Sequence, residues 1–469
     1  MESSSRTARR GLELDAFQGQ QFRPGDNGYD DARAVYNAMI DKRPALIARC
    51  SGVADVVEAV NLARERGVPL AVRCGGHSVA GKGVCDDGIL IDLSGMKGVH
   101  VDPEARVARA NAGVLWGEFD RETQLFGLAT AGGRMTTTGV GGFTLGGGYA
   151  WISTKHGLAC DNMVSAQVVT AEGRVVNVGE DENADLLWGL RGGGGNFGVV
   201  TSFEFGLYEL GPIVMGGMVV HTIESAREVA RAWRDWVEEA PEAVCTALDI
   251  LLAPREPFVP PEIQGTPVLA LVAMYAGDPD EGEQVLRPLK NEIGPPALDL
   301  LERLPYTAFQ AIVDPLSPKG WLNYHRGAHL AGLPDEAIDA YVEYGARVKS
   351  PMSQSMLFRH GGAIGRVAED ATAASHREAP YMWHPLACWC DPADTDGAIA
   401  WVREASAAMR PFMTGGVYLN FEQDEGEGHV RAGYSPEKYA RLVALKDKYD
   451  PNNLFQINQN IAPSPASAR

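Results

Sequence analysis

Apolar runs typical of strands alternate with helical patterns over the first 210 residues. The strand-like runs lie at 45–49, 70–73, 89–93, 106–110, 166–170, 174–178 and 199–205. Residues 53–64 place apolar side chains at i, i+3, i+4 and i+7, and shorter helical patterns lie at 116–125 and 184–190. This alternation predicts a mixed α/β or α+β domain.

After residue 210 the helical patterns become longer. Helices are predicted at 225–240, 280–293 and 335–349, with a strand at 268–275 and a final helix at 436–449. Such a change indicates a second domain built from a sheet and helices.

Charge and cysteine content narrow the possible partners. Among 469 residues, 42 Lys and Arg stand against 61 Asp and Glu, so the net charge is −19. A surface this acidic repels nucleic acid and anionic membranes. The seven cysteines lack the paired spacing of a disulfide framework, and Cys388 and Cys390 are too close together for a zinc site with His384. No apolar run follows the basic N-terminus and none could span a bilayer, so we expect a cytoplasmic protein without a metal.

Glycine is concentrated in four clusters within the first 200 residues. The loop at 73–78 follows a strand, and its successive N–H groups could bind a diphosphate. The segment 131–149 is rich in glycine and hydroxyl groups, which suits packing against a flat ring system. Residues 193–198 match G-x-G-x-x-G, but a strand follows where a dinucleotide-binding fold requires a helix.

These segments together resemble a known flavoprotein family. The segments at 73–78, 139–162, 191–200 and 449–461 look like the berberine-bridge-enzyme branch of the vanillyl-alcohol-oxidase superfamily, in the order found there. The resemblance implies an α+β fold with a two-subdomain PCMH-type FAD-binding domain and a substrate domain whose antiparallel sheet is flanked by helices. The FAD-binding domain would take residues 1–210, with a core at about 40–208, and the helix and tail at 426–469. Residues 211–425 would form the substrate-binding domain.

The resemblance also implies how FAD is held. The histidine of the Gly-Gly-His motif, here His77, would bond to the flavin 8α carbon. Many members add a cysteinyl bond, but the matching position is Met135, so we expect a single covalent attachment. The other residues expected to hold FAD are Arg73, Cys74, Gly75, Gly76, Ser78, Gly81, Gly133, Thr137, Thr138, Gly139, Gly142, Gly148, Asp161, Asn162, Gly198, Val200, Asn458 and Asn460.

The catalytic base departs from the family pattern. Several relatives carry Tyr-x-Asn-Tyr with the last tyrosine as the base, but this chain has Tyr418-Leu-Asn-Phe421. The replacement candidates are Tyr418, His360, Gln354 and Glu422. Side chains alternate along the strand-like run at 354–360, so Gln354, Met356 and Phe358 share one face, although each could equally pack in the core. Trp321, Tyr324, Tyr381 and Trp383 could line an apolar pocket or pack in the core.

The resemblance implies an FAD-dependent oxidase that acts on an alcohol, amine or phenolic natural product of secondary metabolism. The substrate would transfer a hydride to flavin N5, and dioxygen would accept the electrons and give hydrogen peroxide. The small Thr138 would leave room for dioxygen. An oxygenase and a non-catalytic flavin-binding protein are the alternatives, the latter because the usual tyrosine base is missing. The expected partners are a small-molecule substrate and dioxygen, and the chain would be a monomer or a homodimer.

Overall fold

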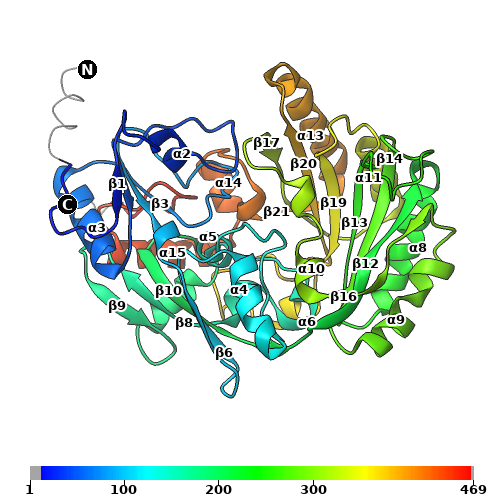
Figure 1. The fold of residues 1–469 in the computed structure, drawn as a ribbon, viewed down its shortest axis with the longest axis horizontal. Helices are drawn as coiled ribbons and strands as arrows, with labels where there is room; N and C mark the ends of the chain where they lie inside the picture. Colours follow the sequence, from blue (N-terminus) through cyan, green and yellow to red (C-terminus); the bar gives the residue numbers. More distant parts are fainter. Residues whose placement is uncertain (1–11, 466–469) are drawn as a thin grey trace.

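The structure is a computed structural model that describes residues 12–465. Most of the basic N-terminal segment and the end of the C-terminal tail lie outside these residues. The ribbon shows two halves side by side: residues 12–210 form one half, and the middle of the chain forms the other (Figure 1). Among the described residues, no helix combines the length and apolar character needed to cross a membrane.

A four-stranded sheet opens the first half. Its strands are β1 (Gln20–Phe22), β2 (Leu46–Arg49), β3 (Leu70–Arg73) and β4 (Ile89–Asp92), in the order β1-β2-β4-β3. β4 pairs in parallel with both β2 and β3, and the helix α3 (Val53–Arg66) connects β2 to β3. The chain leaves β3 directly into the first glycine loop, so the sheet fixes where that loop begins.

A five-stranded sheet completes this half. β5 (Val99–Asp102), β6 (Val107–Asn111), β10 (Val199–Gly206), β8 (Met163–Val169) and β9 (Val175–Val178) are neighbours in that order, and all pairs are antiparallel. The long glycine-rich segment runs between β6 and β8 and contains the short helix α5 (Val140–Leu145). The last helix, α15 (Pro436–Tyr449), returns to this half, where Leu442 and Leu445 join its hydrophobic core (Figure 1).

The second half is a ten-stranded antiparallel sheet. Its path is β15-β12-β14-β13-β19-β20-β18-β21, and β16 and β17 pair at its margins. The strands are β12 (Ile213–Thr222), β13 (Val244–Leu252), β14 (Pro267–Tyr275), β15 (Leu298–Asp299), β16 (Glu302–Pro305), β17 (Leu322–His325), β18 (Ala328–Leu330), β19 (Gln354–Arg359), β20 (Tyr381–Trp389) and β21 (Met413–Val417). β12 and β14 are among the longest, because apolar side chains fill both faces.

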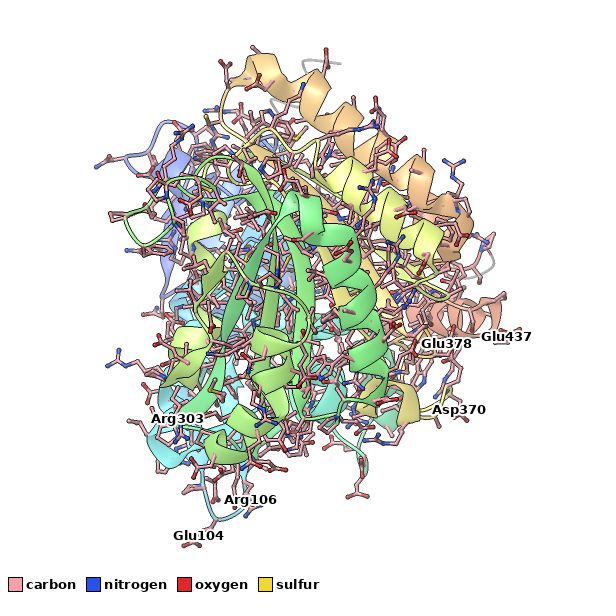
Figure 2. All side chains as sticks on the ribbon, turned by 90° about the vertical axis from the view of Figure 1, so that its right-hand side faces the viewer. Glu104, Arg106, Arg303, Asp370, Glu378 and Glu437 are labelled. Atoms are coloured by element: carbon pink, nitrogen blue, oxygen red, sulfur yellow. The ribbon has the colours of Figure 1, made fainter. Side chains whose placement is uncertain are left out.

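The four longest helices of this half cover one face of the sheet. They are α8 (Ala226–Glu239), α9 (Pro279–Asn291), α11 (Asp335–Gly345) and α13 (Thr395–Met409), and Figure 2 shows them in front of the strands. Side chains alternate along each strand, so Leu248 and Leu357 face the helices while Ala247 and Met356 face the first half. The expected α+β fold with a helix-flanked antiparallel sheet is confirmed, and the helices predicted at 225–240, 280–293, 335–349 and 436–449 are all present.

Candidate active site

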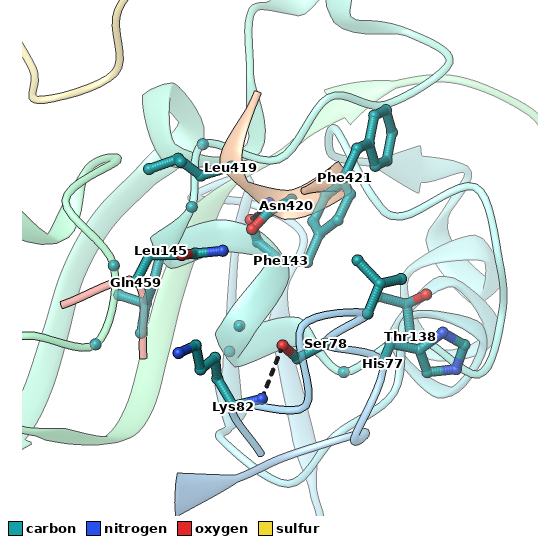
Figure 3. A pocket seen from close by; sticks show the side chains of 18 of the residues that line it. His77, Ser78, Lys82, Thr138, Phe143, Leu145, Leu419, Asn420, Phe421 and Gln459 are labelled. Atoms are coloured by element: carbon teal, nitrogen blue, oxygen red, sulfur yellow. Dashed lines mark hydrogen bonds between the residues drawn. The ribbon is translucent and has the colours of Figure 1, made fainter. Parts of the chain in front are cut away.

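A cavity of about 350 Å³ lies between the two halves. Glycine loops of the first half form one wall, and β19, β20 and residues 417–422 form the other. Figure 3 shows His77 and Thr138 together at one side of this pocket and Leu145 and Gln459 at the other. The cavity is therefore bounded by both halves and by the returning C-terminal segment.

Bare backbone forms the glycine wall. The loops at 75 and 139 lie so close that a Cβ atom on Gly75 would be 2.3 Å from the Gly139 amide nitrogen. Gly142 and Gly195 also line the cavity, and a Cβ on either would meet no protein atom within 4 Å. Such a cradle suits a large flat ligand that packs against main chain.

Twelve of the residues predicted to hold the cofactor line this cavity. They are Arg73, Cys74, Gly75, Gly76, His77, Ser78, Thr138, Gly139, Gly142, Gly198, Val200 and Asn458. The amide of Asn458 donates to the carbonyls of Gly195 and Phe455, while its Oδ1 atom is buried without a hydrogen bond among the described residues. An acceptor left open at the wall is a further sign that a polar ligand belongs there.

The remaining predicted cofactor residues do not line the cavity. They are Gly81, Gly133, Thr137, Gly148, Asp161, Asn162 and Asn460. Asp161 forms a buried ion pair with Arg377 at 2.6 Å, and Asn162 donates to the carbonyls of His156 and Leu158. Asp161 and Asn162 therefore stabilise the segment around them through contacts within the protein. This role explains their place in the family motif without direct contact with a ligand.

His77 is held as a neutral imidazole at the edge of the cavity. Its Nε2 atom lies 2.9 Å from Thr137 Oγ1, and its ring stacks on Tyr36 with centroids 4.6 Å apart. Burial lowers the pKa of His77 to about 4, and nearby Lys319 adds to this effect. A neutral imidazole is the form that can act as a nucleophile.

Arg73, at the end of β3, supports the first loop through a buried ion pair. Its guanidinium lies 2.8 Å from Asp92, a carboxylate that also binds Arg49 at 2.8 Å. Burial opposes ionisation of Asp92, but the two arginines hold the pKa of that carboxyl below its ordinary value. The charge of Arg73 is therefore already neutralised by protein.

Tyr418 faces the glycine wall, and its hydroxyl receives three N–H donors. The backbone amides of Gly148 and Tyr149 donate to Oη at 3.0 and 2.9 Å, and the Asn420 amide donates at 3.1 Å. Gly148 adopts φ +81°, a left-handed conformation that suits glycine and directs its amide toward the tyrosine. Burial raises the pKa of Tyr418, while the three donors and Arg134 act to lower it.

The other predicted catalytic residues also line the cavity, but their surroundings differ. Gln354 is buried, and its Oε1 atom has no hydrogen-bond partner among the described residues. His360 bonds through Nδ1 to the Ala379 carbonyl at 2.8 Å, and burial lowers its pKa to about 4. Glu422 accepts from the Gly327 amide at 2.7 Å and lies 3.1 Å from His429, so its carboxylate stabilises the chain segment around it.

The aromatic residues proposed for a pocket pack in the core instead. Tyr381 and Trp383 lie on the helix-covered side of the large sheet, and Tyr324 packs with Trp389 under α13. Trp321 is only partly buried and does not line the cavity. The pocket interpretation was wrong for all four: the strand positions of Tyr324, Tyr381 and Trp383 direct them away from the cavity, and Trp321 precedes β17 at its margin.

Sequence reasoning missed two residues that line the cavity, His384 on the sheet wall and Arg134 in the glycine-rich segment. His384 was considered only as a metal ligand, yet it lines the cavity, and its ring stacks on Phe421 with centroids 3.7 Å apart. Arg134 lies next to Met135 and also lines the cavity. The alternation of residues 381–389 was the one signal for His384, and a basic residue inside a glycine-rich loop was the signal for Arg134.

Comparison with known proteins agrees with this geometry. The family model described as "FAD binding domain" matches residues 44–179, and the model "Berberine and berberine like" matches residues 417–462. The chain is 31% identical to (R)-6-hydroxynicotine oxidase from Paenarthrobacter nicotinovorans, over 96% of this chain and 97% of that one.

Solved structures show the same fold. The crystal structure of 6-hydroxy-D-nicotine oxidase from Arthrobacter nicotinovorans matches with a TM-score of 0.87 and 28% identity, covering 97% of this chain and 99% of that one. Glucooligosaccharide oxidase from Acremonium strictum, which carries a 6-S-cysteinyl, 8α-N1-histidyl FAD, matches with a TM-score of 0.83 and 24% identity over 98% and 100% of the two chains.

Fold and cavity thus define an FAD-binding oxidoreductase of the PCMH type. The chain belongs to the berberine-bridge-enzyme-like family of FAD-linked oxidoreductases. The residues present fit the cofactor, because the bare backbone at Gly142 and Gly195 leaves space for a ring system and Asn458 offers an open acceptor.

Proposed function

We propose that the chain is an FAD-dependent oxidase with one covalent flavin bond through His77. Its substrate is an alcohol, amine or phenolic natural product, and dioxygen is the final electron acceptor. Residues 1–210 and 426–469 form the FAD-binding domain, and residues 211–425 bind the substrate. FAD supplies a two-electron acceptor when bound. The observation that carries the proposal is Tyr418, whose hydroxyl meets three N–H donors opposite the glycine wall.

Tyr418 takes the proton that the substrate releases. A phenolate oxygen has three lone pairs and a phenol oxygen two, so the three N–H donors stabilise the phenolate, and the Asn420 side chain releases its bond when Oη takes up the substrate proton. Since burial raises its pKa, the free protein holds mostly the protonated tyrosine at neutral pH, and the ionised fraction grows as pH rises. Tyr418 therefore replaces the base that Phe421 cannot provide, while Gln354 orients the substrate through its open Oε1.

Single attachment is supported by the two side chains beside the loop. Met135 lines the cavity, but a thioether has no proton to lose and cannot supply a thiolate. His77 is neutral, and its Nε2 is engaged by Thr137, which leaves Nδ1 as the nitrogen for the bond. Thr138 and Phe143 line the same cavity, and the small Thr138 leaves room for dioxygen.

The attachment is tested by acid precipitation of the purified protein. Yellow colour that stays in the washed pellet, and is lost from the pellet in His77→Ala, supports the histidyl bond. Thr137→Val is a matched variant: it removes the hydrogen bond to Nε2 but keeps the imidazole, so it should retain colour with slower attachment. Flavin that washes out of wild-type protein would rule out the covalent bond and leave the fold unaffected.

Turnover separates the three functional alternatives. An oxidase bleaches its flavin with substrate under argon and releases peroxide in air in proportion to product. An oxygenase transfers oxygen into product, which mass spectrometry with ¹⁸O₂ detects, and releases little peroxide. A non-catalytic flavin-binding protein shows no bleaching with any alcohol, amine or phenol of a broad panel. The oligomeric state and the cytoplasmic location remain predictions.

A further inference from the structure

Arg134 holds a positive charge inside a cage of aromatic rings at the cavity wall. Its Cζ atom lies 3.8 Å from the ring centroid of Phe358, 5.2 Å from Tyr149, and 5.5 Å from both Trp151 and Phe421. Phe358 belongs to β19 and Phe421 to the segment 417–422, while Tyr149 and Trp151 lie at the end of the glycine-rich segment, so both halves contribute to the cage. The rings fix the plane and position of the guanidinium.

This cation has no anionic partner among the described residues. Its Nη1 atom is buried without a hydrogen bond, and no carboxylate oxygen of those residues lies within 4.0 Å of its nitrogens. The buried Arg73 and Arg377, by contrast, are paired with Asp92 and Asp161 at 2.8 and 2.6 Å. Unpaired buried charge is costly, and aromatic faces offset only part of that cost.

Asp249, the carboxyl whose charge acts on Arg134, does not form an ion pair with it. Asp249 on β13 is buried, and burial raises its pKa to about 7, with Arg134 acting in the opposite direction. Its Oδ1 atom has no hydrogen-bond partner, and among the described residues no ion pair within 4.0 Å joins its carboxylate to the Arg134 guanidinium. Burial lowers the pKa of Arg134 only to about 10, so the side chain remains charged at neutral pH.

We propose that the substrate is a carboxylate and that Arg134 binds this group within the aromatic cage. The proposal rests on the function proposed above, because Tyr418 and Gln354 line the same cavity and would act on the rest of the substrate. A guanidinium fork matches the planar geometry of a carboxylate, and Arg134 lines the cavity that would hold the substrate. The buried, unpartnered Nδ1 of His384 and Oε1 of Gln354 complete a polar surface around an apolar body.

The cofactor's own diphosphate is a less suitable partner. The loop at 73–78 brings glycine backbone to one wall, the type of loop that binds phosphates, whereas the Arg134 guanidinium packs on Phe358 of β19 and lies near Phe421, on the opposite side of the cavity. Arg134 is therefore placed to select the substrate.

The test compares benzoate with benzamide, two flat probes of the same size that differ in charge. Binding is followed by the visible flavin spectrum and, independently of flavin, by tryptophan fluorescence, because Trp151 is part of the cage. We expect wild-type protein to prefer benzoate by about 30-fold, the factor set by the loss of one desolvated charge pair. Arg134→Met should reduce the preference to about one, and Arg134→Lys should retain part of it.

Arg303→Met is the matched control, since Arg303 is exposed and lies on the surface in Figure 2. It should leave the preference unchanged. Equal binding of both probes by wild-type protein, no detectable binding of either probe, or a preference that survives in Arg134→Met would each overturn the proposal. If Arg134→Met does not fold, the wild-type ratio and Arg134→Lys decide. If the purified wild-type protein contains no flavin but tryptophan fluorescence still shows tighter binding of benzoate than of benzamide, the anion site would be supported and the proposed oxidase contradicted.

Discussion

The two walls of the cavity are built from different materials. On one side, glycines bring main chain to the cavity, as at Gly142 and Gly195. On the other side, β19, β20 and residues 417–422 present side chains such as Gln354, His384 and Tyr418. A backbone wall suits one cofactor and tolerates little change, whereas a side-chain wall can alter its substrate while the fold persists. The following experiments change one wall at a time.

The largest effect is expected from filling the glycine wall. In Gly142→Leu, the new side chain enters the cavity without a backbone penalty, because Gly142 is helical and lacks positive φ. Covalent flavin content should fall at least tenfold, since even a few Å³ of overlap with a rigid ring is not tolerated in a packed site. Gly397→Leu, in the exposed part of α13 with equal space, should keep full flavin content, measured as absorbance of denatured protein. Full flavin content in Gly142→Leu would place the cofactor elsewhere.

The next effect concerns the side-chain wall. Tyr418→Phe removes the hydroxyl but keeps the ring, so flavin content should remain and kcat/KM should fall by about 10²- to 10⁴-fold, the contribution of a positioned base. Stopped-flow reduction under argon measures this step directly. Phe421→Tyr is the matched variant: the ring keeps its place on His384 and gains a hydroxyl at the position where relatives carry their base. An unchanged reduction rate in Tyr418→Phe would move the base to another residue.

The glycine wall was largely predictable from sequence, and the sheet wall only in part. Gly75 and Gly139 lie on loops whose composition alone indicates close backbone contact, and the structure places them against each other. The alternation of residues 354–359 correctly placed Gln354 and Met356 on the cavity side of β19. Short-range patterns were sufficient for the glycine loops and for β19, because the direction of a side chain within one strand, or the glycine content of one loop, can be read from neighbouring residues alone.

Long-range register explains what could not be predicted. His384 on β20 reaches the cavity because it pairs with Met356 on the neighbouring strand β19. Arg134 is surrounded by rings from β19, from residues 149–151 and from Phe421. No local sequence pattern predicts such contacts between residues that lie far apart along the chain. The same limitation made Tyr381 and Trp383 look like pocket residues, although both face the helices.

A smaller effect sharpens the role of the donors around Tyr418. Asn420→Ala removes one N–H bond to its hydroxyl and one to the Phe143 carbonyl. That donor lowers the pKa of Tyr418, so its loss should move the alkaline rise of kcat/KM upward by about one pH unit, the worth of one hydrogen bond to a charged oxygen. A pH profile between 7 and 11 measures the shift, and Tyr418→Phe should lack this limb. If the alkaline rise of kcat/KM stays at the same pH in Asn420→Ala, a group other than Tyr418 is responsible for that rise.

The smallest effect concerns stability, and the histidines of the side-chain wall contribute to it. Burial depresses the pKa of four histidines around the cavity, to about 3 for His325 and about 4 for His360, and well below the ordinary value for His329 and His384. Each unfolded histidine takes up a proton near pH 6.5, whereas the folded one does so only near pH 4 or below. Between about pH 4 and pH 6.5 the unfolded state therefore binds more protons than the folded state. The stability that these histidines contribute above pH 6.5 is lost as the pH falls through this range.

Two buried carboxyls act in the opposite direction. Burial raises the pKa of Asp120 and Asp249 to about 7, so the folded state keeps protons that the unfolded state releases above pH 4, and acidification favours folding through these groups. Four histidines outweigh two carboxyls, so Tm should fall by several degrees between pH 7 and pH 5. Asp249→Asn should steepen that fall and His360→Gln should flatten it, as calorimetry would show. A Tm that rises on acidification would mean that the two carboxyls, and not the four histidines, determine how stability changes between pH 7 and pH 5.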